Sequence, residues 1–427
     1  MNTDSLEIKP LQKPLDAEVS VPGSKSYTNR ALLIAALANG ESHLTGALFS
    51  DDTDYMVQAL RRLSVSIEAD PKTASFVVAG NGGRIPADGA ELYIGNSGTT
   101  SRSITSYVAL GNGTFIIDGD APMRQSRPMA DLLDALGQLG IDARSRNGCL
   151  PIEVRAKGFR GGKTRLDASK SSQFLTSLLL VAPYADNGLE IEMVSEFKTE
   201  YIDITMAVMQ AFGIEVEHDE YRRFRVAGSQ CYTPRTYTIE PDASNASYFF
   251  AAAALTGGRV RVADIAADSA QGDIHFVDVL EKMGCTVNRY ARGVEVIGPD
   301  QLRGIDVDMK AISDTSLTLA AIAPFAKDPV RIRNIEHTRW QETDRIAAMV
   351  AQLSRLGVEV EEHKDGVTIA PSKPKSSSID TYKDHRVAMS FALVGLRVPG
   401  IYINDPRCVG KTFPTYFAVW DQIKGSA

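Results

Sequence analysis

The sequence predicts an α/β protein of two similar domains, each built from three copies of one supersecondary unit. The 427 residues exceed what one hydrophobic core normally serves, so two domains of roughly 200 residues are expected. A polar turn followed by an apolar helix recurs six times, at intervals of about 70 residues, as expected for repeated supersecondary units. In five copies a second helix follows and leads into a run of β-forming residues.

The first helix of each copy is apolar on almost every side and begins after Ser, Thr, Asn, Asp or Gly. The six copies are GSKSYTNRALLIAALANG (from Gly23), GNSGTTSRSITSYVALGNG (from Gly95), DASKSSQFLTSLLLVAPYADNG (from Asp167), PDASNASYFFAAAALTGG (from Pro241), SDTSLTLAAIAPFAKD (from Ser313) and KDHRVAMSFALVGLRVPG (from Lys383). Helices of this kind are buried, and their first N–H groups need acceptors. Helix capping is therefore an alternative role for each polar residue in these turns.

In four copies the second helix ends near a glycine, at Gly140, Gly213, Gly284 and Gly357. Glycine at this position favours a left-handed helix C-cap. The alternating run 213–217 that follows one of them predicts a strand. The sixth copy is cut short by the C-terminus.

Composition excludes several classes of protein. The 46 Lys and Arg against 53 Asp and Glu give a net charge of −7, which argues against a nucleic-acid partner. No apolar stretch is long enough to cross a membrane, and the N-terminus lacks the apolar core of a signal peptide, so we expect a cytoplasmic protein with no membrane partner. The four cysteines and six histidines show no ligand spacing, so no metal and no cofactor are expected.

Basic residues recur beside the helix starts, at Lys25, Arg30, Arg102, Lys170 and Arg386. Helix N-termini and cations that gather on one face form an anion site, and two such faces would line a cleft. Arginine suits phosphate and carboxylate because it binds them bidentately. The pattern predicts a small ligand with several negative charges. The alternative is that each Lys or Arg is simply a solvated surface residue, as a single basic residue usually is. GSKS (23–26) and GKT (410–412) lack the spacing of a P-loop, and no GxGxxG opens a helix.

Ten motifs carry a specific resemblance. They are PGSKSYTNR, GNSGTTSR, RQSRPM, SSQFLT, YIDIT, DASNASYF, GDIHFVDVLEKMG, ETDR, DHRVAM and KTFP, in this order along almost the whole chain. Together they resemble the enolpyruvyl transferases, and within them the 5-enolpyruvylshikimate-3-phosphate synthases. The resemblance implies transfer of an enolpyruvyl group from phosphoenolpyruvate to the 5-hydroxyl of shikimate 3-phosphate, by a monomer.

The resemblance also implies a fold of the inverse α/β barrel type, with two lobes of three βαβαββ-like repeats each. The lobes would comprise residues 1–22 with 241–427, and residues 23–240, with the active site in the cleft between them. The implied site residues match the family's motifs position by position. Those for shikimate 3-phosphate are Lys25, Ser26, Arg30, Ser171, Ser172, Gln173, Lys198, Tyr201, Asp314, His337 and Gln341. Those for phosphoenolpyruvate are Lys25, Asn96, Gly98, Thr99, Arg127, Gln173, Glu342, Arg345, His385, Arg386 and Lys411.

The resemblance implies three catalytic residues. Asp314 would act on the attacking hydroxyl, Glu342 would protonate carbon, and Lys25 would share in proton transfer. Each carboxylate has a plainer alternative: Asp314 could be an N-cap, and Glu342 could pair with Arg345 on a helix surface. His385 could be structural, orienting the turn that carries Arg386.

Four positions depart from the family's pattern. Gln341 stands where Lys is frequent, His337 replaces a frequent Asn, and Lys198 stands where Ser is usual. We therefore expect Lys198, helped by Lys170, to supply the phosphate charge that Gln341 lacks. Ser103 stands where Pro is common, on the helix that carries Gly98, and predicts weakened inhibition by the family's inhibitor glyphosate.

Two alternative functions stay open at this stage. One is the related transferase that acts on UDP-N-acetylglucosamine, although the loop GDAPMRQSRP lacks the cysteine usual there. The other is a non-catalytic protein that binds a phosphorylated metabolite, which would not need Asp314 and Glu342 together.

Overall fold

A computed structural model of the chain describes residues 5–197 and 200–425. Its internal contacts divide the chain into two compact units, Met1–Pro22 with Pro241–Ala427 (unit 1) and Gly23–Glu240 (unit 2). Each unit has its own hydrophobic core. The two are described one at a time.

Unit 2 contains three copies of a βαβαββ repeat. The first is β14 (Thr236–Thr238), α1 (Lys25–Leu37), β3 (Asn39–Thr45), α2 (Asp51–Arg62), β4 (Ser66–Asp70) and β5 (Ser75–Asn81). The second is β6 (Gly89–Tyr93), α3 (Gly98–Val108), β7 (Asn112–Asp118), α4 (Ala121–Gln125), α5 (Ala130–Gln138), β8 (Asp142–Ser145) and β9 (Ile152–Lys157). The third is β10 (Gly162–Leu166), α6 (Gln173–Val181), β11 (Leu189–Met193), α7 (Glu200–Ala211), β12 (Glu217–Asp219) and β13 (Arg223–Val226).

Unit 1 repeats the same plan. Its first copy is β2 (Asp16–Val19), α8 (Ala243–Thr256), β15 (Arg259–Ala263), α9 (Phe276–Lys282), β16 (Thr286–Tyr290) and β17 (Gly293–Ile297). Its second is β18 (Asp306–Asp308), α10 (Ser316–Ile322), β19 (Val330–Arg333), α11 (Arg345–Arg355), β20 (Val360–His363) and β21 (Gly366–Ile369). Its third is β22 (Ser377–Ile379), α12 (His385–Ala392), β23 (Ile401–Asn404), α13 (Tyr416–Gly425) and β1 (Ser5–Ile8).

Every four-stranded sheet has the same strand pattern. In β6-β7-β9-β8, the pair β6·β7 is parallel, and β7·β9 and β8·β9 are antiparallel. The helix between the parallel strands supplies the crossover that such a pair requires. The sixth sheet has only three strands, in the order β1-β23-β22, and the N-terminal strand β1 takes part in it. The predicted βαβαββ-like repeat is confirmed, with one strand fewer in this last copy.

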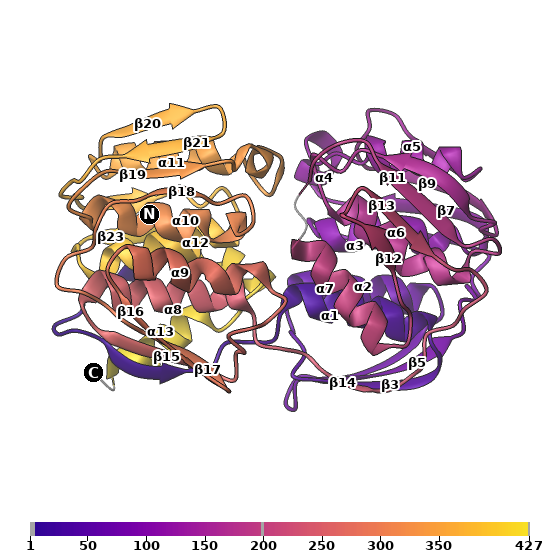
Figure 1. Cartoon of the computed structure of the whole chain (residues 1–427), viewed down its shortest axis with the longest axis horizontal. Helices are drawn as coiled ribbons and strands as arrows, with labels where there is room; N and C mark the ends of the chain where they lie inside the picture. The colour runs from indigo at the N-terminus through magenta and orange to yellow at the C-terminus, as the bar shows by residue number, and fades with distance from the viewer. Residues whose placement is uncertain (1–4, 198–199, 426–427) are drawn as a thin grey trace. The chain divides into compact units, whose positions relative to one another are not determined.

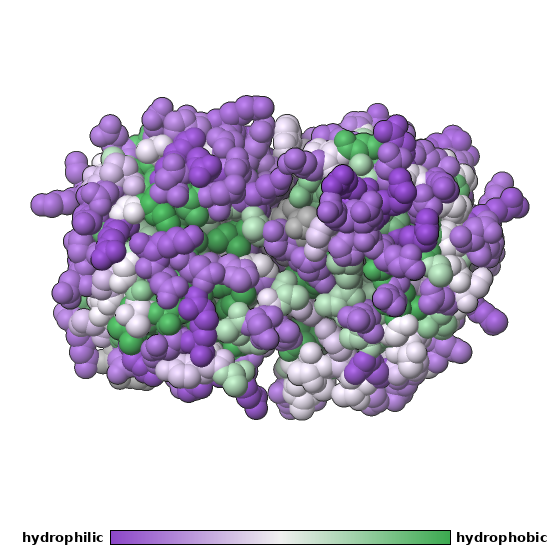
Figure 2. All heavy atoms as spheres, viewed as in Figure 1, coloured by the Kyte–Doolittle hydropathy of each residue, from purple (hydrophilic) through white to green (hydrophobic). Residues whose placement is uncertain are grey.

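Buried helices form the middle of each unit. Figure 1 shows α8, α10 and α12 inside unit 1, with sheets around them. Residues 243–255 of α8 are all buried, as are 11 residues of α1, which confirms the prediction from their apolar sequences. Each large apolar side chain buried in this way contributes about 1.5–3 kcal/mol. Figure 2 shows mostly hydrophilic residues on the face in view, with smaller hydrophobic areas among them.

The four predicted helix-ending glycines all have positive φ, from 74° at Gly357 to 107° at Gly284. The strand predicted over 213–217 is wrong for most of its length, because β12 begins only at Glu217. After Gly213 the chain turns back, and the Ile214 N–H donates to the Met209 carbonyl at 3.0 Å. Ile214 is 2% exposed, so this residue fills the core at the end of α7.

No helix in the described part of the chain combines the length and the apolar character that crossing a bilayer requires.

Candidate functional site

Unit 1 gathers three cations and three carboxylates near the starts of α10, α11 and α12. We call this set, with the Gln341 amide, the Arg345 cluster. Its members are Asp314, Gln341, Glu342, Arg345, Asp384, Arg386 and Lys411. Asp314 lies in the short helix η3 (Ser313–Thr315), and Lys411 ends the short helix η7 (Pro406–Lys411).

Arg345 lies at the centre of the cluster with 2% of its side chain exposed. Its guanidinium lies 2.8 Å from Asp384, 3.0 Å from Glu342 and 3.3 Å from Asp314. Burial alone would lower the pKa of Arg345, but the nearby charges of Asp384, Glu342 and Asp314 outweigh it, so that pKa is raised. Three carboxylates thus hold one buried cation in place.

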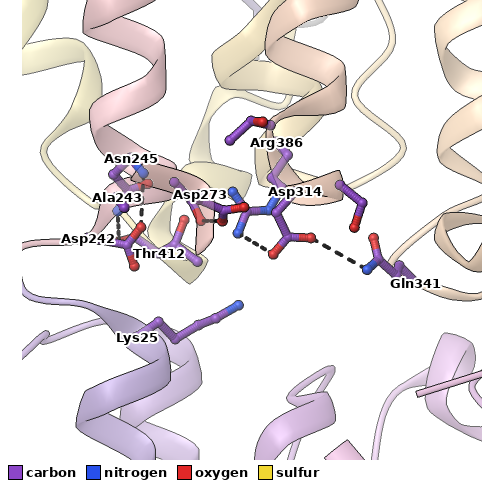
Figure 3. Close-up of polar contacts among 12 residues, drawn as sticks. Lys25, Asp242, Ala243, Asn245, Asp273, Asp314, Gln341, Arg386 and Thr412 are labelled. Atoms are coloured by element: carbon purple, nitrogen blue, oxygen red, sulfur yellow. Dashed lines mark hydrogen bonds and ion pairs between the residues drawn. The ribbon is translucent and has the colours of Figure 1, made fainter. Parts of the chain in front are cut away.

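Asp314 bridges two elements of the cluster. One carboxylate oxygen accepts from Arg386 Nη2 at 2.9 Å, and the other lies 3.5 Å from Gln341 Nε2 (Figure 3). The N-cap of α10 is Thr315, so the alternative that Asp314 caps this helix is wrong. Side-chain capping bonds do occur at the starts of α8 and α12, made by Asp242 and Asp384.

Glu342 precedes α11 and contacts a cation with each oxygen. Its Oε1 lies 2.8 Å from Lys411 Nζ, and its Oε2 lies 3.0 Å from Arg345 Nη2. The ion pair between Glu342 and Arg345, which was the plainer alternative for Glu342, is therefore present. It does not lie on a helix surface, however, because the two side chains are only 8% and 2% exposed.

Two histidines adjoin the cluster. His337, in the short helix η5 (Glu336–Trp340), lies with Nε2 2.8 Å from the Ser313 hydroxyl. His385 is 1% exposed, and its Nδ1 lies 3.5 Å from Asp384 Oδ1. The position of His385 at the first turn of α12 fits the structural role considered for it as well as a ligand role.

In unit 2, Arg30 is buried among uncharged acceptors. Its guanidinium donates to the Thr205 hydroxyl at 2.8 Å and to the Ser26 and Tyr201 carbonyls at 2.9 and 3.1 Å. Thr176 lies 3.3 Å away on α6. Burial lowers the pKa of Arg30 to about 10. The site thus carries a positive charge, and α1, α6 and α7 each supply acceptors for it.

A second group in unit 2 forms where α3 and α6 begin. Arg127 donates to both oxygens of Asn96, its carbonyl and its side chain, at 2.9 Å. The Gln173 side chain links the two helices, accepting from Arg102 and donating to Thr99, each at 3.3 Å. A methyl group on Gly98 would overlap the Arg127 and Arg102 guanidinium groups, so only glycine leaves them in place.

The remaining predicted residues of unit 2 lie near these groups in the fold. Lys25, in the first turn of α1, has Nζ 3.9 Å from Asp52 Oδ2. Ser172 is the N-cap of α6 and makes no side-chain capping bond among the residues described, and the Ser171 hydroxyl accepts from the Gln173 N–H at 3.3 Å. Lys198 lies outside the described residues. Lys170 pairs with Asp131 at 3.1 Å.

Several residues of these groups were not predicted as site residues. Asp384 holds Arg345 and caps α12, and Thr176 and Thr205 hold Arg30. For Asp384 the sequence did carry a signal, since an Asp directly before a buried helix is a usual N-cap. Nothing in the sequence separates Thr176 and Thr205 from other threonines of apolar helices.

The comparisons with known proteins agree with one another. Residues 10–420 match the family model of EPSP synthase (3-phosphoshikimate 1-carboxyvinyltransferase). A 3-phosphoshikimate 1-carboxyvinyltransferase of Nostoc punctiforme is 50% identical over 98% of this chain and 99% of its own length. One from Marinomonas sp. is 43% identical, over 98% of this chain and 99% of its own.

The fold has solved counterparts as well. An EPSP synthase structure from Acinetobacter baumannii matches with a TM-score of 0.83 and 26% identity, covering 99% of this chain and 98% of the other. The EPSP synthases have the inverse α/β barrel fold that the resemblance implied, and the repeats of this chain agree with that fold. The chain belongs to the EPSP synthase (3-phosphoshikimate 1-carboxyvinyltransferase) family.

Proposed function

We propose that the protein transfers the enolpyruvyl (carboxyvinyl) group of phosphoenolpyruvate to the 5-hydroxyl of shikimate 3-phosphate and releases inorganic phosphate. This is a step of the shikimate pathway of aromatic amino-acid biosynthesis. The observation that carries the proposal is the Arg345 cluster, where three cations meet Asp314 and Glu342 in a chain that matches this family over nearly its whole length. The matches reported above do not support UDP-N-acetylglucosamine as the acceptor.

Phosphoenolpyruvate carries a phosphate and a carboxylate, and both need cations. We assign them to Arg345, Arg386 and Lys411 of unit 1. Unit 2 supplies Lys25, Arg127, Asn96, Thr99 and Gln173, with Gly98 leaving the backbone accessible. We also assign His385 to phosphoenolpyruvate binding, because it directly precedes Arg386. The geometry that supports this is the fixing of Arg127 and Arg345 by at least two side-chain hydrogen bonds each, and of Arg386 by its bond to Asp314, which orients their donors before the ligand arrives.

Shikimate 3-phosphate would be held mainly by unit 2. Arg30 suits its carboxylate, since it is a buried cation that donates to the hydroxyl and carbonyl oxygens described above. Ser171, Ser172 and Gln173 would bind the phosphate at the start of α6, with Ser26 and Tyr201 beside them. Asp314 of unit 1 would act on the 5-hydroxyl, and His337 and Gln341 of the same unit would also bind shikimate 3-phosphate. The proposal therefore assigns residues of both units to the same two substrates.

The chemistry requires two proton transfers. Asp314 takes the proton of the 5-hydroxyl while the hydroxyl oxygen bonds to C2 of phosphoenolpyruvate. Glu342 protonates the C3 methylene. The product of this step is a tetrahedral intermediate. Loss of a C3 proton then expels phosphate and restores the double bond. Lys25 shares in these transfers, and the cations stabilise the charge on the departing phosphate.

Lys198 remains our candidate for the phosphate charge that Gln341 cannot provide. If the hypothesis holds, Lys198→Ala raises the Michaelis constant for shikimate 3-phosphate. An unchanged constant would show that it is wrong. We further propose a monomer acting in the cytoplasm, where both charged metabolites are retained. Light scattering coupled to size-exclusion chromatography measures the oligomeric state.

A phosphate-release assay with both substrates tests the activity directly. The parent should release phosphate only when both substrates are present, and Asp314→Ala should lower kcat by about 10²–10⁴-fold. Asp328→Ala is the matched control, because Asp328 is 61% exposed and pairs only loosely with Lys327 at 4.0 Å. Binding of both substrates without phosphate release would instead favour the non-catalytic alternative.

A further inference from the structure

The turn that leads into α12 has a strained backbone. Across residues 381–384, the Asp384 N–H donates to the Thr381 carbonyl at 2.8 Å, and the two central residues, Tyr382 and Lys383, have φ of 54° and 58°. These features are those of a type I′ turn, which favours Asn, Asp or Gly at its centre. Any other residue in the left-handed region is disfavoured by roughly tenfold. Two adjacent residues of this kind persist only where the surroundings hold them.

A second turn of the same type shows what normally holds it. In the turn 219–222, Glu220 and Tyr221 have φ of 42° and 58°, and the Arg222 N–H donates to the Asp219 carbonyl at 2.7 Å. The antiparallel strands β12 and β13 flank this turn, and their ladder fixes it. The turn 381–384 connects β22 to a helix, so no such ladder closes across it. Its support must come from side chains.

Gln352 of α11 supplies that support. Its side-chain carbonyl accepts from the Asp380 N–H at 3.0 Å, and its amide donates to the Tyr382 hydroxyl at 2.8 Å. Gln352 is 0% exposed, so both of its polar ends would lose their partners if the turn moved away. The Asp380 carboxylate is held too, by Asn404 at 2.9 Å and by Arg355 at 2.6 Å.

The turn ends on Asp384, which links two helices of the Arg345 cluster. Asp384 lies 2.8 Å from Arg345 and accepts from the Arg386 N–H at 2.8 Å. Gln352 follows Arg345 by seven positions, or two helical turns, so the two residues share one face of α11. This face therefore contacts the segment 380–384 at both of its ends. If the turn left its left-handed conformation, Asp384 would move away from Arg345.

The strain and the contacts that oppose it are of similar size. The two central residues together disfavour the turn by roughly a hundredfold, whereas one net hydrogen bond favours it by about fivefold. The two bonds of Gln352 thus offset a large part of the strain. Loss of one bond should lower the fraction of molecules with Asp384 in place by up to about fivefold. A ligand that requires this state then binds more weakly in the same proportion.

We propose that Gln352 and Tyr382 are positioning residues for phosphoenolpyruvate. They hold the turn 381–384 in its strained form, and Asp384 then fixes Arg345 and the first turn of α12, which carries Arg386. This inference rests on the proposed function, because it takes phosphoenolpyruvate as the ligand of the two arginines. Shikimate 3-phosphate is assigned mainly to unit 2, so its binding should depend little on this turn.

Tyr382→Phe tests the proposal with the smallest change. It removes only the hydroxyl of a residue that is 44% exposed, so folding is not at risk. The Michaelis constant for phosphoenolpyruvate should rise about fivefold, while that for shikimate 3-phosphate should stay within about twofold of the parent. Gln352→Leu removes both bonds and should raise the first constant roughly twentyfold. Steady-state phosphate release measures both constants.

Tyr290→Phe is the matched control. Tyr290 of β16 is also 44% exposed, and its hydroxyl donates to Glu295 at 3.3 Å. The substitution therefore removes one hydrogen bond of an equally exposed tyrosine elsewhere in unit 1. Neither Michaelis constant should change.

A rescue experiment separates positioning from a general loss of packing. Lys383→Gly removes the strain at one central position, whereas Lys383→Ala removes the same charge but keeps the Cβ atom that causes the strain. Combined with Tyr382→Phe, the glycine should return the Michaelis constant for phosphoenolpyruvate to within about twofold of the parent. The alanine should not. Lost packing around Gln352 would not respond to the backbone at position 383.

Three results would overturn the inference: an unchanged constant for phosphoenolpyruvate in Tyr382→Phe, an equal rise for both substrates, or equal effects of glycine and alanine at position 383. Tyr382→Phe and its double variants decide the matter even if Gln352→Leu does not fold. In each case phosphate release by the parent would leave the proposed function standing. Absence of phosphate release by the parent would instead remove the proposed function itself.

Discussion

Arg30 in unit 2 and Arg345 in unit 1 are equally buried, at 3% and 2% exposed, yet the protein treats their charges in opposite ways. Arg30 contacts hydroxyl and carbonyl oxygens, and burial lowers its pKa to about 10. Arg345 contacts three carboxylates, whose charges outweigh burial and raise its pKa. The first site attracts an anion by its own charge, whereas the second can bind one only by exchanging partners.

The comparison teaches that burial alone does not decide what a buried cation contributes. Uncharged acceptors hold a guanidinium in place but leave its charge uncompensated, at a cost to stability. Carboxylates compensate the charge but then compete with any ligand. The following experiments separate these two effects.

The largest expected effect is on the stability of Arg345→Met. Removing one partner of a buried ionic network leaves charges without compensation, which costs about 3–5 kcal/mol. Here Asp384, Glu342 and Asp314 would lose their shared cation. Arg339→Met is the matched control, since Arg339 also contacts two carboxylates but is 20% exposed, and partly exposed pairs contribute about 1 kcal/mol or less. Chemical denaturation measures both, and equal losses would contradict the comparison.

The deficit of Arg345→Met should also depend on pH. In the parent, the raised pKa means that the Arg345 contribution is present below the unfolded-state pKa and is lost only as pH rises through the folded-state pKa. It is therefore constant from about pH 5 to 9. In the variant, the uncompensated carboxylates favour their protonated forms, so the deficit should shrink as pH falls towards 5. A deficit of constant size across this range would point to lost packing instead of lost charge.

A middle-sized effect is expected for Gly98→Ala, on binding and not on stability. The added methyl group would displace the Arg127 and Arg102 guanidinium groups at the start of α3. We expect the Michaelis constant for phosphoenolpyruvate to rise about tenfold, or roughly 1.4 kcal/mol. Gly137→Ala provides the control, because a methyl group there meets no atom within 4 Å. Steady-state kinetics should leave that control unchanged.

The smallest stability effect is expected for Arg30→Met. The Thr205 hydroxyl still donates to the Tyr201 carbonyl at 2.8 Å without Arg30, so few polar groups lose all partners. Removing an uncompensated buried charge should leave the free energy of unfolding within about 1 kcal/mol of the parent, or raise it. The Michaelis constant for shikimate 3-phosphate should nevertheless rise strongly. A loss of stability like that of Arg345→Met would remove the distinction between the two arginines.

Much of the fold followed from local patterns in the sequence. The six apolar helices, the glycines at 140, 213, 284 and 357, and the repeated order of strands are each encoded within one repeat, so a single chain suffices to find them. The run 213–217 misled because its alternation also suits a chain that turns inward, as Ile214 does. Periodicity alone does not distinguish a strand from such a turn.

The candidate site was harder to predict from the sequence than the fold. Resemblance gave the residues, but the pairing of Asp314 with Arg386, 72 positions apart, depends on how α10 and α12 pack. The same holds for Arg30 and Thr205, which are 175 positions apart. Charge compensation is a property of such long-range contacts, and the sequence therefore could not reveal that Arg30 and Arg345 differ.

The pairing of the two N-terminal strands has a consequence for synthesis of the chain. β2 pairs with β15 (Arg259–Ala263), and β1 pairs with β23 (Ile401–Asn404). During synthesis, β2 therefore lacks its partner until residues 259–263 are made and β1 until residues 401–404 are made, while unit 2 can already close its own sheet with β14. A truncated product ending at Glu240 would retain a complete unit 2. It would also carry β1 and β2 without their partner strands, which would favour aggregation or proteolysis.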